Sequence, residues 1–171
     1  CHSREYIFVD DGSTDNTLFT LNSLKVKLPG TVRVIRRTNK GASFSTNEAV
    51  LMARGYWVRL LDGDDLIAYG STSKMLRLAK QKKEEFVYGL IYEDKITYTH
   101  DSADNYVLQS KNEGLKKFIR NCPANSSCMF LSVKRYLMSG GCEQTFVSPD
   151  QILFLRLFSS GKGIFLKETV A

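Results

Sequence analysis

The segment Ile7–Thr17 reads IFVDDGSTDNT and contains the signal that decides the fold. An apolar run of strand length ends abruptly in Asp10 and Asp11, and a glycine and several small polar residues follow. Such residues after a buried strand are typical of a turn that leads into a helix, and Ser13 is placed to cap that helix. The same residues also suit a ligand site at the end of a strand. The segment alone leaves both interpretations open.

Apolar runs of strand length alternate with segments of helical period along most of the chain, a pattern typical of crossover units. The expected strands cover residues 6–9, 32–35, 56–61, 86–92, 127–131 and 163–166. The expected helices cover residues 18–28, 43–54, 71–83, 113–119, 134–138 and 150–158. The polar stretch 93–112 predicts a hairpin or an irregular excursion. We therefore expect an α/β fold in a single domain over residues 1–171, with a mixed, mainly parallel sheet flanked by helices.

Composition and charge narrow the functional classes only slightly. The chain has 171 residues, of which 43% are hydrophobic and 25% charged, so disordered and fibrous proteins are excluded. The net charge of +6 suits nucleotide phosphates or a membrane surface, and equally a solvated surface. No nucleic-acid-binding module is present, so nucleic acid is not an expected partner. No signal peptide, membrane span or CxxC cysteine pair is recognisable, which predicts a cytoplasmic location.

A second expected strand also ends in acids, in the segment LLDGDDL at residues 60–66. Because the carboxyl ends of parallel strands meet at one edge of a sheet, we expect this cluster to lie near the first one. Residues two apart in an extended segment face the same side, so Asp62 and Asp64 can address one ligand while Gly63 lets the backbone approach it. Their oxygens suit a divalent cation, Mn²⁺ or Mg²⁺, that also binds substrate phosphates.

Other cation-binding and phosphate-binding motifs do not fit these segments. An EF-hand loop that began at Asp62 would need a carboxylate at its twelfth position, where the chain has Ser73. A phosphatase-type Asp-x-Asp-x-Thr motif and a P-loop are also absent from the sequence. Neither a calcium loop nor a P-loop nucleotide site is therefore expected.

Four segments, taken together and in order, resemble the family-two glycosyltransferases, whose nucleotide-sugar-binding fold is called GT-A. They are YIFVDDGSTDNT (6–17), NKGASFSTNEAV (39–50), GYWVRLLDGDDL (55–66) and SPDQILFLRLFSSGK (148–162). The resemblance implies an inverting enzyme that transfers a sugar from a nucleotide-diphospho-sugar, with a UDP-sugar as the expected donor. A glycan or a lipid-linked saccharide is the implied acceptor.

The resemblance also implies roles for individual residues. Asp11 matches the acid that contacts the uracil or equivalent base. Asp10 shapes the turn beside it and is also an expected nucleotide-sugar-binding residue. Asp62 matches the first acid of the family DxD motif, near the ribose or the metal, and Asp64 matches the acid that binds the divalent cation. The implied donor-site residues of the second segment are Asn39, Gly41 and Asn47.

Asp150, in the fourth segment, matches the acid that acts as general base in inverting members of the family. A helix cap is the alternative, because Ser148 and Pro149 form a good helix-start pattern with it. The two roles are compatible with each other.

The chain departs from the family pattern in two places. Thr46 stands where an arginine is frequent, so Arg36, Arg37 or Lys40 is expected to supply the phosphate contact. The family's opening strand and the helix after it have no counterpart before Cys1. We therefore expect an N-terminally truncated fragment whose sheet lacks its first strand, with further segments missing after the last strand as well.

Two alternative functions fit the sequence, and one segment could form a membrane-contact surface. A nucleotidyltransferase would carry a glycine-rich phosphate loop near its start, in a region that this chain does not contain. A catalytically silent nucleotide- or glycan-binding domain is the alternative that is not an enzyme. The basic, amphipathic run SKMLRLAKQKK at residues 73–83 fits peripheral contact with the inner face of the membrane, or simply a solvated helix face.

Overall fold

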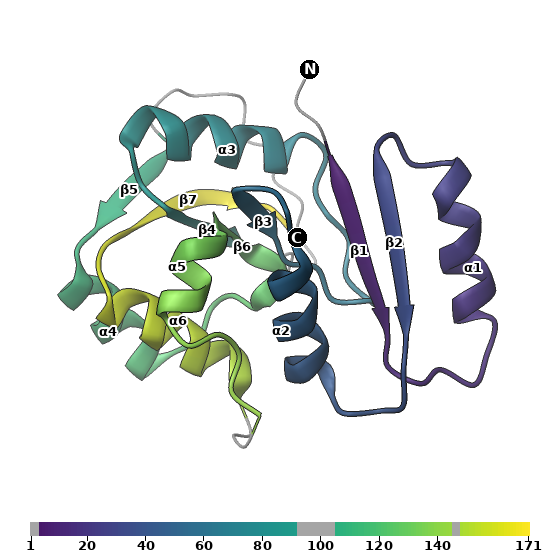
Figure 1. Cartoon of the computed structure of the whole chain (residues 1–171). Helices are drawn as coiled ribbons and strands as arrows, with labels where there is room; N and C mark the ends of the chain where they lie inside the picture. Colours follow the sequence, from purple (N-terminus) through teal and green to yellow (C-terminus); the bar gives the residue numbers. More distant parts are fainter. Residues whose placement is uncertain (1–3, 92–104, 145–147) are drawn as a thin grey trace. The chain divides into compact units, whose positions relative to one another are not determined.

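The computed structural model describes residues 4–91, 105–144 and 148–171, and it divides the chain into two units, Cys1–Tyr56 and Trp57–Ala171 (Figure 1). The first unit contains a two-stranded sheet, and the second contains a five-stranded mixed sheet. The α/β class expected from the sequence is therefore confirmed.

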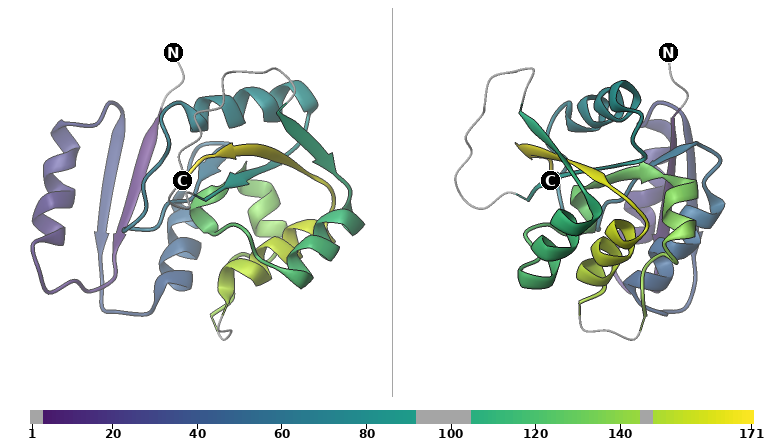
Figure 2. Two further views of the ribbon diagram at one scale, coloured as in Figure 1. Left: turned by 180° about the vertical axis from the view of Figure 1, so that it is seen from behind. Right: turned by 90° about the vertical axis from the view of Figure 1, so that its left-hand side faces the viewer.

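The first unit is built on a pair of parallel strands. Strand β1 (Glu5–Asp10) pairs with β2 (Thr31–Arg36) along its whole length, so that Asp10 lies opposite Arg36. The helical segments are α1 (Thr17–Ser23), the 3₁₀ turn η1 (Leu24–Val26) and α2 (Ala42–Met52). Helices α1 and α2 lie on opposite sides of the strand pair (Figures 1 and 2).

Ser13 does not cap a helix, so that prediction is wrong. Its backbone N–H donates to Oδ1 of Asp10 at 2.9 Å, which closes a turn directly after β1. Helix α1 begins only at Thr17, whose N–H is accepted by the Asp15 carboxylate at 2.9 Å. Because the Ser13 N–H is bonded to Asp10, the chain forms a turn at Ser13 and the helix begins four residues later, at Thr17.

The second unit places its strands in the order β3-β6-β4-β7-β5. Their bounds are β3 (Trp57–Arg59), β4 (Phe86–Leu90), β5 (Tyr106–Gln109), β6 (Met129–Ser132) and β7 (Gly163–Thr169). The helical segments are α3 (Ser71–Lys82), α4 (Lys111–Arg120), η2 (Ser126–Cys128), α5 (Val133–Met138) and α6 (Pro149–Ser159). Helix α3 covers one face of the sheet, and α4 and α6 cover the other (Figure 2).

The sheet is mixed, as expected, but fewer of its pairs are parallel than the sequence pattern suggests. Strands β4 and β7 are parallel, whereas β3–β6, β4–β6 and β5–β7 are antiparallel. The reversal arises because β6 runs between β3 and β4 in the opposite direction, which alternating apolar segments cannot reveal. The expected alternation at residues 106–108 corresponds to β5, while that at residues 96–98 lies outside the described residues.

Aromatic side chains form the core between the sheet and the pair α4–α6. Phe118 of α4 stacks on Phe154 of α6 with ring centroids 4.0 Å apart, and Tyr88 of β4 meets both helices edge-on. Gly114 lets the two helices approach, because a Cβ atom there would overlap the ring of Phe158. The close packing of α4 on α6 therefore depends on the absence of a side chain at Gly114.

The end of β7 anchors the segment that precedes α3. The carbonyl oxygen of Val170 accepts hydrogen bonds from the Arg59 guanidinium at 2.8 Å, the Ala68 N–H at 3.1 Å and the Ser71 hydroxyl at 3.2 Å. None of the helices among the described residues is long and apolar enough to cross a membrane.

Gly114→Ala tests the α4–α6 contact. The added methyl group has no space beside Phe158, so we expect a loss of about 1–3 kcal/mol in the free energy of unfolding, measured by urea denaturation. Gly63→Ala is the matched control, because no heavy atom lies within 4 Å of a Cβ atom there. Equal stability of the two variants would contradict the packing argument.

Candidate functional site

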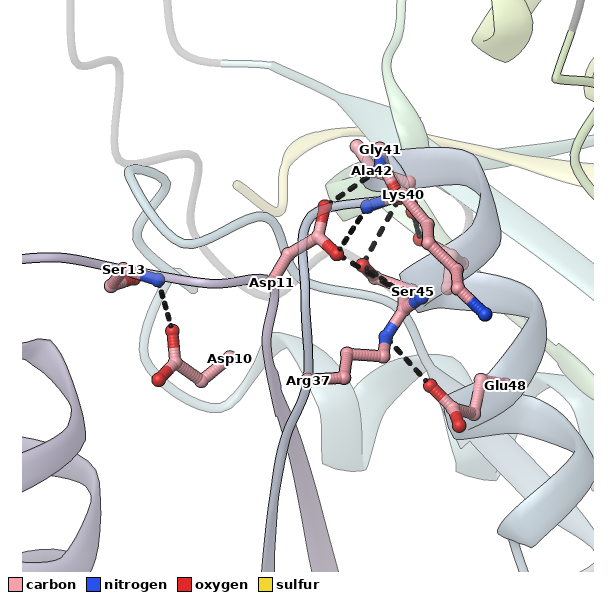
Figure 3. Close-up of polar contacts among 10 residues, drawn as sticks. Asp10, Asp11, Ser13, Arg37, Lys40, Gly41, Ala42, Ser45 and Glu48 are labelled. Atoms are coloured by element: carbon pink, nitrogen blue, oxygen red, sulfur yellow. Dashed lines mark hydrogen bonds and ion pairs between the residues drawn. The ribbon is translucent and has the colours of Figure 1, made fainter.

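Asp10 lies at the end of β1, and its carboxylate bonds to the turn that follows the strand (Figure 3). It is 2% exposed, and its second carboxylate oxygen lies 3.6 Å from Nε of Arg36. Hydrogen bonds from the side chain and backbone of Ser13 lower the pKa of the Asp10 carboxyl. The residue is therefore an ionised structural anchor of the turn, which agrees with the turn-shaping role expected for it.

Asp11, just after β1, holds the two residues that precede helix α2 (Figure 3). Its Oδ1 accepts the N–H of Lys40 at 2.9 Å and its Oδ2 accepts the N–H of Gly41 at 2.7 Å. The guanidinium of Arg37 lies 3.4 Å from Oδ1. The carboxylate thus stabilises the positive end of the helix. Each oxygen keeps a second lone pair, so the expected contact with a nucleotide base stays a prediction.

The loop between β2 and α2 contains the other expected donor-site residues. Gly41, with φ of 94°, precedes the first helical residue and is held by Asp11. Asn39 is exposed, and its backbone N is 3.0 Å from where a Cβ atom on Gly12 would lie. Asn47 lies within α2. Their contacts with a donor stay predictions.

Arg37 is the least exposed and the most engaged of the three cations that were expected to replace the missing arginine. It pairs with Glu48 at 2.9 Å and lies 4.3 Å from the ring centre of Phe44. Arg36 and Lys40 are more exposed. Because Arg37 already carries two carboxylate partners, Lys40 is the cation with more freedom to meet a phosphate.

The acids after β3 form a short loop in the second unit. The Asp65 N–H donates to the Asp62 carbonyl at 3.2 Å, which closes a turn around Gly63. Asp64 is exposed and makes no hydrogen bond or ion pair with any of the residues that the structure describes. Asp62 and Asp65 are half-buried and are held from the other side by η2. Of the three acids, Asp64 is thus the most available to a ligand.

Three consecutive polar residues face this loop, and the sequence interpretation assigned none of them to the site. The Asn125 amide donates to Oδ2 of Asp65 at 2.8 Å. The Ser126 hydroxyl donates to Oδ2 of Asp62 at 2.7 Å, and the hydroxyl of Ser127 accepts the Asp62 N–H at 2.9 Å. Serine and asparagine before a strand are ordinary loop residues, so only the paired strands reveal these contacts.

Asp150 lies beside the same loop, at the first turn of α6. Burial raises the pKa of its carboxyl, the neighbouring Asp62 charge raises it further, and hydrogen bonding with Ser126 partly offsets both effects. The next residue, Gln151, donates from its side chain to the Phe118 carbonyl at 2.7 Å and so fixes the start of α6 on α4. The second unit thus brings two expected site residues, Asp62 and Asp150, together.

Three buried or half-buried thiols surround these acids. Burial raises the pKa of Cys122, Cys128 and Cys142, and the charge of Asp150 contributes in each case. The pKa of Cys128 reaches about 11. Thiols of this kind are protonated at neutral pH and are poor nucleophiles, so the chemistry of this region belongs to the carboxylates.

The expected cation site is only partly formed by the protein. Among residues 4–91, 105–144 and 148–171, no three His, Cys, Asp or Glu side chains form a group that could hold a metal ion. Asp64 is nevertheless unengaged, and Asp62 uses only Oδ2 in its bond to Ser126. Two carboxylates fit Mg²⁺ or Mn²⁺, which takes its remaining ligands from water and substrate phosphates. The residues present therefore fit a cation that arrives with a diphosphate.

A family model described as glycosyl transferase family 2 matches residues 3–138. This segment includes both acid-tipped strands and the loop that holds Asp62. The chain belongs to glycosyl transferase family 2. Asp150 lies beyond the matched segment, so its role rests on its position beside Asp62.

Relatives of the chain include a chondroitin synthase and a poly(ribitol-phosphate) beta-glucosyltransferase. The chain is 41% identical over 63 residues to a chondroitin synthase of Pasteurella multocida, which is 37% of this chain and 6% of that protein. It is 31% identical over 86 residues to a poly(ribitol-phosphate) beta-glucosyltransferase of Bacillus spizizenii, which is 50% of this chain and 14% of that protein. The matches thus span small parts of these longer proteins.

Solved structures of another protein share the fold. The chain superimposes on the crystal structure of S. aureus TarS 1–349 with a TM-score of 0.75 and 16% identity, over 97% of this chain and 49% of that one. A TarS structure in complex with UDP gives a TM-score of 0.74. The GT-A fold expected from the sequence is therefore confirmed.

Asp11→Ala is expected to weaken the first unit. It removes two charge-assisted acceptors from the start of α2, so we predict a loss of about 1–2 kcal/mol in urea denaturation. Asp64→Ala, which removes an exposed acid without partners among the described residues, should change the stability by less than about 0.5 kcal/mol. If both variants behave alike, the bonds from Asp11 to Lys40 and Gly41 do not stabilise the first unit.

Asp150→Asn is expected to stabilise the protein at neutral pH. Because the native pKa of Asp150 is raised, the folded state holds its proton more tightly than the unfolded state. Wild-type stability therefore falls as the pH rises from the unfolded carboxyl value of about 3.9 through the native value. The Tm advantage of the variant should shrink as the pH is lowered through that window. An Asp150→Asn variant that is less stable at pH 7 would contradict this.

Proposed function

We propose that the chain is the catalytic part of an inverting glycosyltransferase that uses a nucleotide-diphospho-sugar, with UDP as the expected nucleotide. The acceptor would be a hydroxyl group of a glycan or a lipid-linked saccharide. The observation that carries the proposal is that the charge of Asp62 acts on the Asp150 carboxyl and raises its pKa, in a chain of this family.

The acid loop would hold the donor diphosphate through a divalent cation. Asp64 offers both carboxylate oxygens, and Asp62 offers the oxygen that Ser126 leaves uncommitted. A bound Mn²⁺ or Mg²⁺ would stabilise the negative charge that develops on the leaving diphosphate. Gly63 keeps this part of the loop free of side-chain bulk, which suits close approach of a phosphate.

Asp150 would take the proton from the acceptor hydroxyl. Its raised pKa makes it a stronger base than an ordinary aspartate. Attack by the activated hydroxyl on the anomeric carbon, opposite the leaving diphosphate, is a single displacement and inverts the configuration. Gln151 would keep the base in place by tying the start of α6 to α4.

The first unit would contribute donor binding through the residues that match the family motifs. Asp11, Asn39, Gly41 and Asn47 are proposed for the nucleotide, with Lys40 in place of the missing arginine. Asp11 can serve while it holds the residues before α2, because its outer lone pairs remain available. UDP and UDP-GlcNAc complexes of TarS support a uridine nucleotide as the first donor to test.

The exposed face of α3 is the part of the second unit best suited to a membrane. Arg77, Lys80, Lys82 and Lys83 are all exposed near its C-terminal end. Such a basic face attracts anionic lipid headgroups. We propose peripheral contact there as a means of meeting a lipid-linked acceptor.

Two substitutions in the full-length protein separate the proposed roles. Asp64→Asn should weaken Mn²⁺-dependent binding of UDP at least about 10-fold in calorimetric titrations, because a carboxylate ligand is lost. Asp150→Asn should keep UDP binding and lower kcat for sugar transfer about 100-fold or more, because the proton acceptor is lost.

Asp15→Asn is the matched control, since it neutralises an exposed acid whose carboxylate accepts the Thr17 N–H. Binding of UDP that is independent of metal and unchanged in Asp64→Asn would refute the cation role. Transfer that persists in Asp150→Asn would refute the base. A wild-type protein that binds UDP but neither hydrolyses nor transfers the sugar would instead be a silent binding domain.

A further inference from the structure

Lys40, in the loop between β2 and α2, combines a fixed backbone with an uncompensated charge. Its N–H donates to Oδ1 of Asp11 at 2.9 Å, and the N–H of Gly41 donates to Oδ2 of the same carboxylate at 2.7 Å. Its exposed ammonium group forms no ion pair with a carboxylate among the described residues, whereas Asp11 and Glu48 both pair with Arg37. The charge of Lys40 is therefore available to an anion.

The ring of Phe44, in the first turn of α2, contacts this charge. Nζ of Lys40 lies 4.7 Å from the ring centre, and the guanidinium carbon of Arg37 lies 4.3 Å from the same centre. An aromatic ring attracts a cation at such a distance through its quadrupole. The ring is half-buried while Lys40 is exposed, so the less mobile partner of this contact is Phe44.

The two cations depend on the ring to different degrees. Arg37 has two carboxylate partners and also donates to the Ser45 hydroxyl at 2.8 Å, so it would stay in place without the ring. For the ammonium of Lys40, the ring is the one contact that the structure shows among the described residues. A free lysine side chain has many rotamers, and fixing it when a ligand binds costs entropy. Loss of the ring would therefore release Lys40 alone.

We propose that Phe44 is a positioning residue that holds the Lys40 ammonium group in place for a phosphate of the donor. The inference rests on the proposed function, in which Lys40 takes the place of the missing arginine. Phe44 would not touch the donor. It would restrict Lys40 before the donor arrives, so that less entropy is lost on binding. Arg37 would not compete for the phosphate, because two carboxylates already balance its charge.

Phe44→Leu in the full-length protein tests this role. In calorimetric titrations with UDP and Mn²⁺ we expect binding about 2- to 5-fold weaker than in wild type, which corresponds to the loss of one exposed cation–π contact. Phe44→Tyr keeps an aromatic ring and should bind UDP as wild type does. Lys40→Gln removes the ammonium group itself and should weaken binding about 10-fold.

A double-mutant cycle separates positioning from a structural effect. If Phe44 acts through Lys40, Phe44→Leu should change the UDP affinity no further in the Lys40→Gln background. Loss of packing in α2 would instead weaken binding equally in both backgrounds. If Phe44→Leu does not fold, Phe44→Met keeps helix propensity and bulk without a ring, and it should give the same pattern.

Phe19→Leu is the matched control. Phe19 is an exposed phenylalanine of α1 in the same unit, and no cation lies over its ring among the described residues. The substitution should therefore leave the UDP affinity unchanged.

The outcomes separate the two proposals. The positioning role is refuted, and the proposed function stands, if wild type binds UDP and the Phe44 variants without a ring bind it as tightly. The same conclusion follows if these variants lose equal affinity with and without the Lys40 ammonium. If wild type binds no UDP in the presence of Mn²⁺, both proposals are refuted. A loss that disappears in the Lys40→Gln background and is absent from Phe19→Leu supports both.

Discussion

The antiparallel pairing of β3 with β6 is the constraint on which the arrangement of the second unit depends. It is held by backbone hydrogen bonds and by the stacking of Trp57 on Phe130, with ring centroids 5.3 Å apart. All four residues of β6 are buried, so a slip of one residue would exchange the side chains that pack on the two covered faces of the sheet and is disfavoured. The same register decides which side chains meet the acids, so the apolar core of the sheet determines the polar geometry at its edge.

The sequence predicted those elements whose signal is local. Strands β1 and β2 and helix α3 begin and end within one residue of the expected bounds, because each has a clear apolar run or stripe and turn residues beside it. The direction of β6 could not be predicted, since a buried strand of four residues reads the same in either direction. Strand β3 is shorter than expected because the N–H of Asp62 bonds to a serine side chain instead of continuing the ladder.

The residues of the candidate site also fall into those that local sequence signals identify and those that only the tertiary structure reveals. Asp62, Asp64 and Asp150 were identified from their residue types and positions in motifs, and the structure places Asp62 beside Asp150. The bonds from Asp11 to the backbone of Lys40 and Gly41 were not foreseen, because they depend on how the end of β1 lies next to a loop thirty residues later. The roles of Asn125 and Ser126 depend in turn on strand pairing, which no local pattern encodes.

The acid loop is tied at both ends, and this affects how it can recruit a ligand. The Asp62 N–H is fixed to Ser127 on one side, and the Ala68 N–H is fixed to the Val170 carbonyl on the other. A segment with fixed ends has fewer conformations to lose when it closes on a cation. Asp64 can therefore stay exposed and adaptable while most of the entropic cost of ordering its backbone has already been met by folding.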